Sequence, residues 1–336
     1  MTANEESFMK RSTALATVLV AGYASAFSFI ACAQDAYPGK PVRLVVPFVA
    51  GGPTDIQGRM LGEKLTQRLG QQVIIDNRGG AGGNIGMELV AKSPPDGYTL
   101  VIATVGTWAV NPYLYKLPFD VVKDFAPVTQ VSTSPGILVV HPSVPVKNVK
   151  EFIALAKKRP GEFNYGSSGV GGFGHISGEL FDIMAGTKMV HIPYKSSAPS
   201  LTDLIAGQIQ VLFNNMISTT PHVKGGRVRA LATTGAKRSP ALPEVPTLDE
   251  SGLKGYENSS WSAVAAPAGT PRTIVTRLNR EIIDILKLQD IAQKHAEFGA
   301  EIIASTPEQF HAYLKSELAK FEKLVKQAGI KAAAGG

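Results

Sequence analysis

The chain has 336 residues, of which 44% are hydrophobic and 18% are charged, and its formal net charge is +7 at pH 7. These values are those of a globular protein with room for two ordinary domains. The basic residues are scattered, and no run is longer than Lys157-Lys158-Arg159. We therefore expect no nucleic-acid partner and at most a mild preference for acidic small ligands.

Residues 1–33 have the pattern of a signal peptide. Lys10-Arg11 precedes an apolar stretch over 14–30, and Ala31-Cys32-Ala33 is a small-x-small cleavage site. We expect cleavage after Ala33; a retained membrane anchor and a lipoprotein modified at Cys32 are the alternatives. Because Cys32 is the only cysteine, the cleaved chain would have no disulfide, no thiol nucleophile and no cysteine metal ligand.

Strands and helices alternate after this segment. The apolar periodicity predicts a strand at 42–46, a helix at 53–69, a strand at 73–75, a glycine loop at 79–84, a helix at 85–92 and strands at 98–103, 128–131 and 137–140. This strand–helix order favours a parallel sheet with helices on its faces.

The second block repeats the first in kind. It is predicted to contain a helix at 149–158, a strand at 163–165, a glycine- and serine-rich turn at 166–174, a helix at 175–185, a strand at 189–192, a helix at 200–206 and strands at 209–213 and 228–233. The chain should finish with a strand at 261–266, a helix from 271 and a helix from 307 to Gly329, followed by a frayed tail at 331–336.

The most informative feature is the junction at 47–55, where a strand runs into a helix. Ala50, Gly51 and Gly52 are small, so a ligand can approach the backbone, and the first N–H groups of a helix lack helical partners. Such a junction binds an anion without a cationic side chain. A Gly-Gly pair by itself fits a plain tight turn better. The similar junction at 166–174 is what favours anion binding.

Two such blocks, with helices returning at the end, suggest two lobes joined by crossing strands. Ligands of parallel sheets bind at the carboxyl ends of the strands. Facing lobes would therefore place the 50–55 and 166–174 turns on opposite walls of one cleft.

Catalytic alternatives find weaker support. Residues 169–174 satisfy G-x-G-x-x-G, but the next strand ends in His191-Ile192-Pro193-Tyr194-Lys195, which lacks the ribose-binding acid of a dinucleotide site. Ser167 or Ser168 with His175 could form a nucleophile pair, but no orienting acid is adjacent. The six histidines lack metal-ligand spacing. We expect no cofactor, no metal and no catalysis.

Several neutral polar groups could bind a carboxylate reversibly. Thr54, Thr104, Thr107, Ser167 and Ser168 offer hydroxyl groups beside free backbone N–H groups. Asp55 either complements the helix dipole or accepts a hydrogen bond from the ligand. Asn214-Asn215 follows a strand end and could also reach the cleft. Tyr194 and Trp261 fit core or hinge packing as well as a ligand platform.

The chain resembles the periplasmic solute receptors of tripartite tricarboxylate transporters, the Bug-type receptors, over residues 37–330. The resemblance rests on several ordered motifs. They are Tyr37-Pro38, Val46-Pro47-Phe48-x-Ala50-Gly51-Gly52-x-x-Asp55, Asp76-Asn77-Arg78-x-Gly80-Ala81-Gly82-Gly83-Asn84, Pro95-Asp96-Gly97-Tyr98, Asn164-Tyr165-Gly166-Ser167-Ser168-Gly169, His191-x-Pro193-Tyr194-Lys195 and Ala266-Pro267-x-Gly269-Thr270-Pro271.

The resemblance implies a type II periplasmic binding protein-like α/β fold with two lobes, each a mostly parallel sheet flanked by helices. Lobe 1 would comprise 37–135 and 259–336, and lobe 2 would comprise 136–258. The receptor would be a periplasmic monomer that closes on a small organic carboxylate and delivers it to integral membrane transporter subunits; a sensor for a signalling partner is the alternative.

The resemblance, taken with the junctions, gives a set of candidate site residues. They are Phe48, Ala50, Gly51, Gly52, Thr54, Asp55, Thr104, Gly106, Thr107, Ser167, Ser168, Gly169, Gly172, Phe173, His175, Tyr194 and Asn214. Members of the family often carry Gly in place of Ser196 and Asp in place of Asn214. The ligand therefore stays open among dicarboxylates, tricarboxylates, aromatic acids and amino acids.

Overall fold

A computed structural model describes residues 37–328, and the elements below belong to one compact unit that begins at Lys40. The predicted signal peptide and the predicted tail at 331–336 lie outside the described residues. Between residues 37 and 328, none of the helices combines the length and the apolarity that crossing a bilayer requires.

The first sheet is built around a central parallel strand. Strand β1 (Val42–Val46) lies between β2 (Val73–Asn77) and β3 (Thr99–Thr104) and is parallel to both. Helices α2 (Pro53–Leu69) and α3 (Asn84–Ala91) connect these strands. The predicted strand–helix alternation is confirmed here, and α2 begins and ends at the predicted residues.

The segment after β3 is helical, and the sequence analysis predicted no element there. A π-helix, η2 (Gly106–Val110), runs directly into α4 (Asn111–Leu114). A short 3-10 turn, η1 (Ala81–Gly83), occupies the predicted glycine loop. These pieces place backbone close to the carboxyl ends of β1 and β3.

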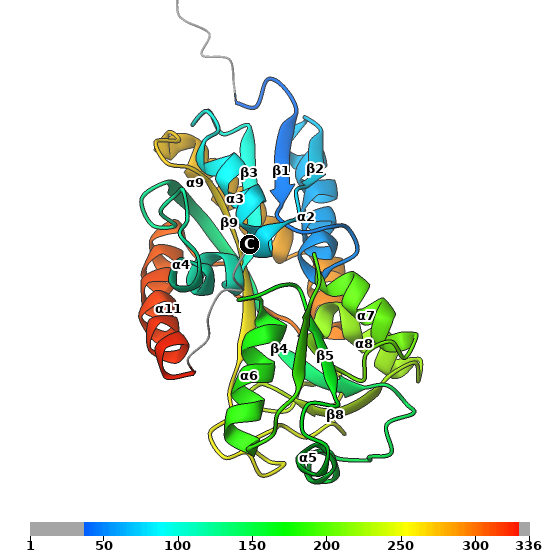
Figure 1. The fold of residues 1–336 in the computed structure, drawn as a ribbon. Coiled ribbons are helices and arrows are strands. Elements are labelled where there is room, and N and C mark those ends of the chain that lie inside the picture. The colour runs from blue at the N-terminus through cyan, green and yellow to red at the C-terminus, as the bar shows by residue number, and fades with distance from the viewer. Residues whose placement is uncertain (1–36, 329–336) are drawn as a thin grey trace, which may run out of the picture. The chain divides into compact units, whose positions relative to one another are not determined.

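Strand β4 (Phe125–Val140) corrects the prediction of two separate strands at 128–131 and 137–140. Up to Pro135 it pairs antiparallel with β9 (Ser259–Pro267), and from Gly136 it pairs with the next sheet. Register shifts occur between Pro127 and Thr129 and between Gln130 and Ser132. One strand therefore belongs to both sheets, as Figure 1 shows.

The second sheet repeats the order of the first. Strand β5 (Asn164–Ser167) lies between β6 (Val190–Pro193) and β7 (Val211–Asn215) and is parallel to both. Helices α6 (Phe173–Ala185) and α7 (Ser197–Ile205) make the connections. The predicted repetition of the two blocks is confirmed by this shared strand order.

The remaining elements complete both sheets. They are α5 (Val149–Lys158), α8 (Met216–Lys224), β8 (Arg229–Thr233), α9 (Arg272–Leu286), α10 (Gln289–Glu297), β10 (Glu301–Ile302) and α11 (Pro307–Ala328). The sequence prediction missed α8, because Pro221 stands inside it, and it also missed α10 and β10. Because Pro221 has no N–H, the Ile217 carbonyl lacks its usual helical donor.

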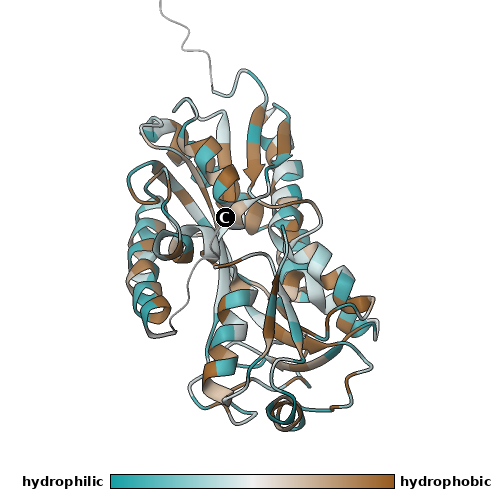
Figure 2. Ribbon diagram, viewed as in Figure 1, coloured by the Kyte–Doolittle hydropathy of each residue, from teal (hydrophilic) through white to brown (hydrophobic). Residues whose placement is uncertain are grey.

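The core follows the two-residue period of the strands. In β4, Ile137 and Val139 pack in a cluster with residues of α7, whereas Leu138 and Val140 pack on the opposite face with residues of α5 and α6. Alternate side chains of a strand point to opposite faces, so helices cover both sides of the sheet. Figure 2 shows hydrophobic residues along the strands and mixed stripes on α6 and α11.

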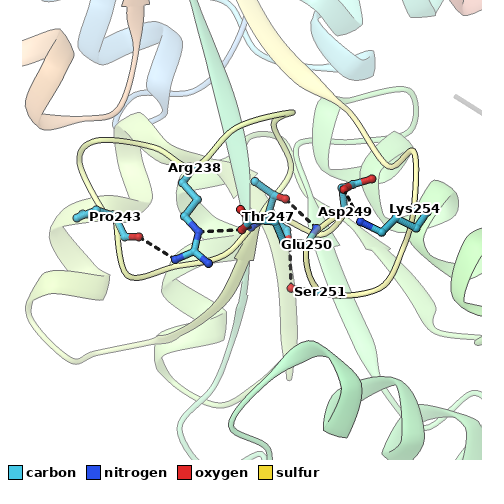
Figure 3. Close-up of polar contacts among 7 residues, drawn as sticks. All are labelled: Arg238, Pro243, Thr247, Asp249, Glu250, Ser251 and Lys254. Carbon is cyan, nitrogen blue, oxygen red and sulfur yellow. Dashed lines mark hydrogen bonds and ion pairs between the residues drawn. The ribbon is translucent and has the colours of Figure 1, made fainter.

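A long connection between β8 and β9 is ordered by polar contacts of its own. Arg238 Nε donates to Glu250 Oε2 at 2.8 Å, and Thr247 N donates to the same carboxylate oxygen at 3.0 Å (Figure 3). Lys254 pairs with Asp249 at 3.0 Å. These exposed contacts contribute little individually, but they fix the path of a segment that has no helix and little strand pairing.

The change of pairing partner in β4 at residues 135–136 coincides with the predicted boundary between the lobes. The division into lobes at 135/136 and 258/259 stays a prediction, since two bodies are defined by relative motion and not by strand pairing alone.

Candidate functional site

A cavity lies at the carboxyl ends of the parallel strands of both sheets. Seven of the candidate residues line it. They are Phe48, Gly52, Thr54, Thr104, Ser168, Phe173 and Asn214. The structure therefore brings the 47–55 junction and the 166–174 junction together around one space, although ligand contact itself stays a prediction.

Seven further lining residues are outside the candidate set, although Asn215 was expected to be able to reach the cleft and Ser196 was noted as a departure from the family pattern. They are Pro53, Gly174, Ser196, Ser197, Phe213, Asn215 and Ser260. Ser196–Ser197 and Asn215 follow β6 and β7, so the rule that ligands bind at carboxyl ends of parallel strands could have found them. Ser260 lies in β9, and its position depends on antiparallel pairing that no local pattern reveals.

Four helices begin at the wall of this cavity. The N-caps of α2 and α6 are Gly52 and Gly172, and neither helix receives a side-chain cap within the described residues. By contrast, Ser196 caps α7 through Ala198 N, and Asn215 caps α8 through Ile217 N. The first N–H groups of α2 and α6 are thus the ones left for a ligand, one helix from each sheet.

The lining combines apolar rings with neutral polar groups and is uncharged. None of its residues is Asp, Glu, Lys, Arg or His. Thr54 and Ser260 are 3% and 4% exposed. A buried hydroxyl needs a hydrogen-bond partner, so these groups are suited to bonding a ligand or water.

Asp55 does not line the cavity. Its carboxylate accepts from Gly51 N–H at 2.9 Å, from Arg59 Nε at 3.0 Å and from Asn77 Nδ2 at 3.0 Å. Burial alone would raise the pKa of Asp55, but these hydrogen bonds and the nearby Arg59 charge outweigh burial and lower that pKa. Asp55 therefore fixes the 50–55 turn, and the Gly51 N–H that the sequence offered to the ligand is already bonded.

Other candidates are bonded within their own turns. Thr107 Oγ1 donates to the Thr104 carbonyl at 2.8 Å, and Gly172 N donates to the Gly169 carbonyl at 3.0 Å. Tyr194 donates to Asp203 at 2.7 Å. The candidates that do not line the cavity include Thr107, Gly169, Gly172, Tyr194, Ala50 and Gly106.

Ser167, His175 and His191 form a buried cluster behind the 166–174 turn. Ser167 Oγ lies 2.6 Å from His191 Nε2, and Gly171 N–H donates to His175 Nδ1 at 3.1 Å. The two imidazole rings stack with centroids 4.1 Å apart, and Tyr165 stacks on the far face of His191. The cluster therefore fixes the conformation of the 166–174 turn through the contacts of Ser167 and His175.

This cluster needs neutral imidazoles. Burial lowers the pKa of His175 to about 4, and burial together with the neighbouring His175 lowers the pKa of His191 to about 3. His175 Nδ1 accepts a hydrogen bond from the Gly171 N–H. A proton on this nitrogen would point at that N–H, so two donors would face each other and the hydrogen bond would be lost. Between residues 37 and 328, no group of three or more His, Cys, Asp or Glu side chains could hold a metal ion.

Two α/β sheets that share crossing strands, with an uncharged cavity at their carboxyl edges, define the periplasmic binding protein class of receptor. The sequence profile described as tripartite tricarboxylate transporter family receptor matches residues 58–330. The chain belongs to this receptor family, which is periplasmic. The resemblance drawn from the motifs is thereby confirmed, as is the fold class.

Individual relatives are similar over most of their length. Protein BugT of Bordetella pertussis is 36% identical over 299 residues, which are 88% of this chain and 92% of that protein. The structure of R. palustris Rpa4515 with adipate is 41% identical with a TM-score of 0.86, covering 88% of this chain and 100% of that chain. The periplasmic binding protein BugD is 35% identical with a TM-score of 0.85, at the same coverage.

Acidification should destabilise the fold through His175. Its pKa is about 4 in the folded chain against an ordinary value of 6.5, so the unfolded chain binds the proton first. The stabilisation is complete above about pH 6.5 and is lost as the pH falls to about 4, amounting to about 3 kcal/mol. The measurement is the free energy of unfolding in urea at about pH 7 and about pH 4.5.

The matched variants are His175→Asn and His311→Asn. The first keeps an acceptor for Gly171 N–H but cannot be protonated, so its stability should vary less with pH than that of the natural chain. His311 on α11 lies outside the ring stack, and its variant should keep the full pH dependence. Equal pH dependence in all three proteins would contradict the role given to His175.

Proposed function

We propose that this receptor captures a small dicarboxylate in the cavity described above and delivers it to the membrane subunits of a tripartite tricarboxylate-type transporter. The observation that carries this proposal is the pair of helix N-termini without side-chain caps, one from each sheet, facing an uncharged cavity. Each such terminus presents free N–H groups and about half a positive charge. The similarity to the adipate-bound Rpa4515 agrees with it.

The lining also argues against amino acids as ligands. An ammonium group taken out of water needs a counter-charge or several acceptors, and no acidic side chain lines the cavity. Asn214 stands where members of the family often carry Asp, so this chain lacks a carboxylate at that point. Acids without an amine are therefore the favoured ligands.

We also propose that the receptor is not catalytic. The only serine with a histidine partner near the cavity, among the described residues, is Ser167, which is 1% exposed and does not line the space. A nucleophile that substrate cannot reach does no chemistry. A periplasmic monomer, released by cleavage after Ala33, completes the proposal.

Asn214→Asp tests the sign of the charge that the cavity accepts. The change keeps size and shape but adds a negative charge to the lining, and like charges about 5 Å apart repel by roughly 1.5–3 kcal/mol. Affinity for adipate or succinate, measured by calorimetry, should fall roughly 10- to 100-fold.

Asn148→Asp is the matched control for this variant. Asn148 caps α5 through Glu151 N at 2.9 Å and lies outside the cavity. Asp is an equally good cap, so the same change of net charge should leave ligand affinity unaltered. An Asn214→Asp variant that binds dicarboxylates as well as the control would contradict anion capture at this site.

Closure of two lobes over the ligand is part of the proposed function, and one contact would form only in the closed form. The Tyr115 hydroxyl, at the end of α4, donates to the Val170 carbonyl in the β5–α6 turn at 2.9 Å. A Cβ atom added at Gly82 would also lie 3.2 Å from that carbonyl. In the predicted division, Tyr115 and Gly82 belong to lobe 1 and Val170 belongs to lobe 2. None of the three lines the cavity.

Tyr115→Phe should weaken the closed form without removing a ligand contact. One neutral hydrogen bond contributes about 0.5–1.5 kcal/mol, so the dissociation rate of the ligand should rise about 2- to 10-fold. Stopped-flow displacement measures this rate. Tyr113→Phe is the control, because Tyr113 lies on the same helix and makes no hydrogen bond to Val170. Identical rates in the two variants would contradict the role given to Tyr115.

A further inference from the structure

Four segments beside the cavity meet one another end to end. They are residues 48–51 and 79–82 of predicted lobe 1 and residues 169–170 and 194–198 of predicted lobe 2. Two close approaches join the lobes. A Cβ atom added at Gly51 would lie 3.5 Å from Ala198 Cβ, and one added at Gly82 would lie 3.2 Å from the Val170 carbonyl oxygen. The predicted lobes therefore touch at these points through backbone and a methyl group.

Contacts within each predicted lobe complete a ring. A Cβ atom added at Gly79 would lie 3.0 Å from Val49 N, and one added at Gly169 would lie 3.5 Å from the Tyr194 carbonyl oxygen. The atom added at Gly169 would also lie 3.5 Å from Gly82 Cα. Each of the four segments therefore touches the next, and we call them together the entrance ring.

The entrance ring is the side of the cavity that can open. Strand β4 pairs with both sheets, and Ser260 of its partner β9 is in the lining. Covalently continuous strands keep the proposed lobes together on that side. The contacts of the entrance ring are noncovalent, and the ring includes the lining residues Phe48, Ser196 and Ser197. Separation of the proposed lobes therefore admits a ligand through the ring.

The exposed charges around the entrance ring are positive. Arg78 directly precedes the 79–82 segment and pairs with Asp76, and Arg59 pairs with Asp55 in the first turn of α2. The side chains of Arg78 and Arg59 are 51% and 56% exposed, whereas those of Asp76 and Asp55 are 18% and 4% exposed. The carboxylates are turned inward and the guanidinium groups face water, so an approaching ligand meets the cations first.

Lys195 belongs to the entrance ring itself. It directly precedes Ser196, which lines the cavity and caps α7. Lys195 is exposed and has no ion pair with any carboxylate between residues 37 and 328. Asp203 on α7 is half-buried and accepts a hydrogen bond from the Tyr194 hydroxyl at 2.7 Å. Lys195 thus presents a full positive charge beside the opening of the cavity.

Only full charges attract a ligand from a distance. The lining residues are uncharged, and the field of a helix N-terminus falls off within its first turn. An exposed charge acts over roughly one Debye length, which is about 8 Å at physiological salt and about 20 Å at about 20 mM salt. The lining can therefore hold a ligand that has arrived, whereas cations at the opening raise the rate at which it arrives.

We infer that the entrance ring attracts dianionic ligands to the cavity and that Lys195 is a residue that determines the rate of ligand capture. The inference rests on the proposed function, because it takes the ligand to be a carboxylate held by the lining. Lys195 does not line the cavity, so it acts before the ligand is bound. The ring cations then govern association, and the neutral lining groups govern dissociation.

Stopped-flow measurement of adipate binding at about pH 7 tests this inference. At about 20 mM salt, Lys195→Gln should lower the association rate constant about 2- to 5-fold, because it removes a unit charge about 8 Å from the path of a dianion. The dissociation rate constant should change less than about twofold. At about 0.5 M salt, where the Debye length is about 4 Å, the association rate constants of the natural chain and the variant should agree.

Lys188→Gln is the matched control. Lys188 is exposed and precedes β6, whereas Lys195 follows β6, so roughly 20 Å of extended chain separates the two lysines. The control changes the net charge equally and should leave both rate constants within about 1.5-fold of the natural values. Lys195→Glu doubles the change in charge and should lower the association rate constant about 4- to 25-fold. Unchanged unfolding temperatures show that the variants fold.

The outcomes separate the two proposals. Equal association rate constants for Lys195→Gln and Lys188→Gln, or an effect that persists at about 0.5 M salt, overturn the inference for Lys195 and leave carboxylate capture standing. Faster dissociation with unchanged association would make Lys195 a ligand contact and would overturn the inference as well. If neither adipate nor succinate binds the natural chain, carboxylate capture itself is wrong, and the inference for Lys195 is overturned with it.

Discussion

The rest of the structure depends on the convergence of helix N-termini at the carboxyl ends of parallel strands. A strand that continues into a helix and then into a parallel strand must place its first turn at one edge of the sheet. Strands β1 and β5 are each central in a set of three parallel strands. The helices that follow them, α2 and α6, therefore begin beside the same cavity. The binding groups proposed above are therefore mainly backbone N–H groups, and several side chains shape the turns that present them.

Strand β4 determines how these two sets of turns meet. Its first part pairs with β9 and its last part with β7, so the two sheets share one continuous backbone. The change of pairing partner from β9 to β7 occurs at Gly136, where an added Cβ atom would lie 2.4 Å from the ring of Phe173. A side chain at this point would displace Phe173, which lines the cavity. The position that joins the sheets is therefore also the one that fixes an apolar wall of the site.

The sequence predicted the elements that are governed by local periodicity and capping. Helix α2 and its end at Gly70, the repeated strand order and the Thr306–Gln309 capping box all appear as expected. Residues lining the cavity at the β1–α2 and β5–α6 turns were also predictable, because glycine and serine turns after strands have a direct physical meaning. Ser260 was not, since its place in the lining depends on antiparallel pairing between strands that lie far apart in the chain.

The same limit explains why Asp55, Ser167 and His175 appeared as ligand-binding candidates. In sequence they stand beside the small residues of each turn, and their chemistry suits a ligand. In the structure their hydrogen bonds go to the turns themselves. Proximity along the chain identifies the right turns, but it does not separate a group that faces the ligand from one that holds the backbone in place.

An uncharged binding surface is also what a delivery function requires. An arginine buried against a carboxylate would form a bidentate ion pair, and separating such a pair in a site shielded from water is slow and costly. Helix N-termini and hydroxyl groups spread the same attraction over several weaker hydrogen bonds, each worth about 0.5–1.5 kcal/mol. Opening of the closed form then breaks these bonds in part and lets water replace them one at a time. Selectivity in such a site comes from the number and spacing of donors, so a receptor of this kind can be selective without making release slow.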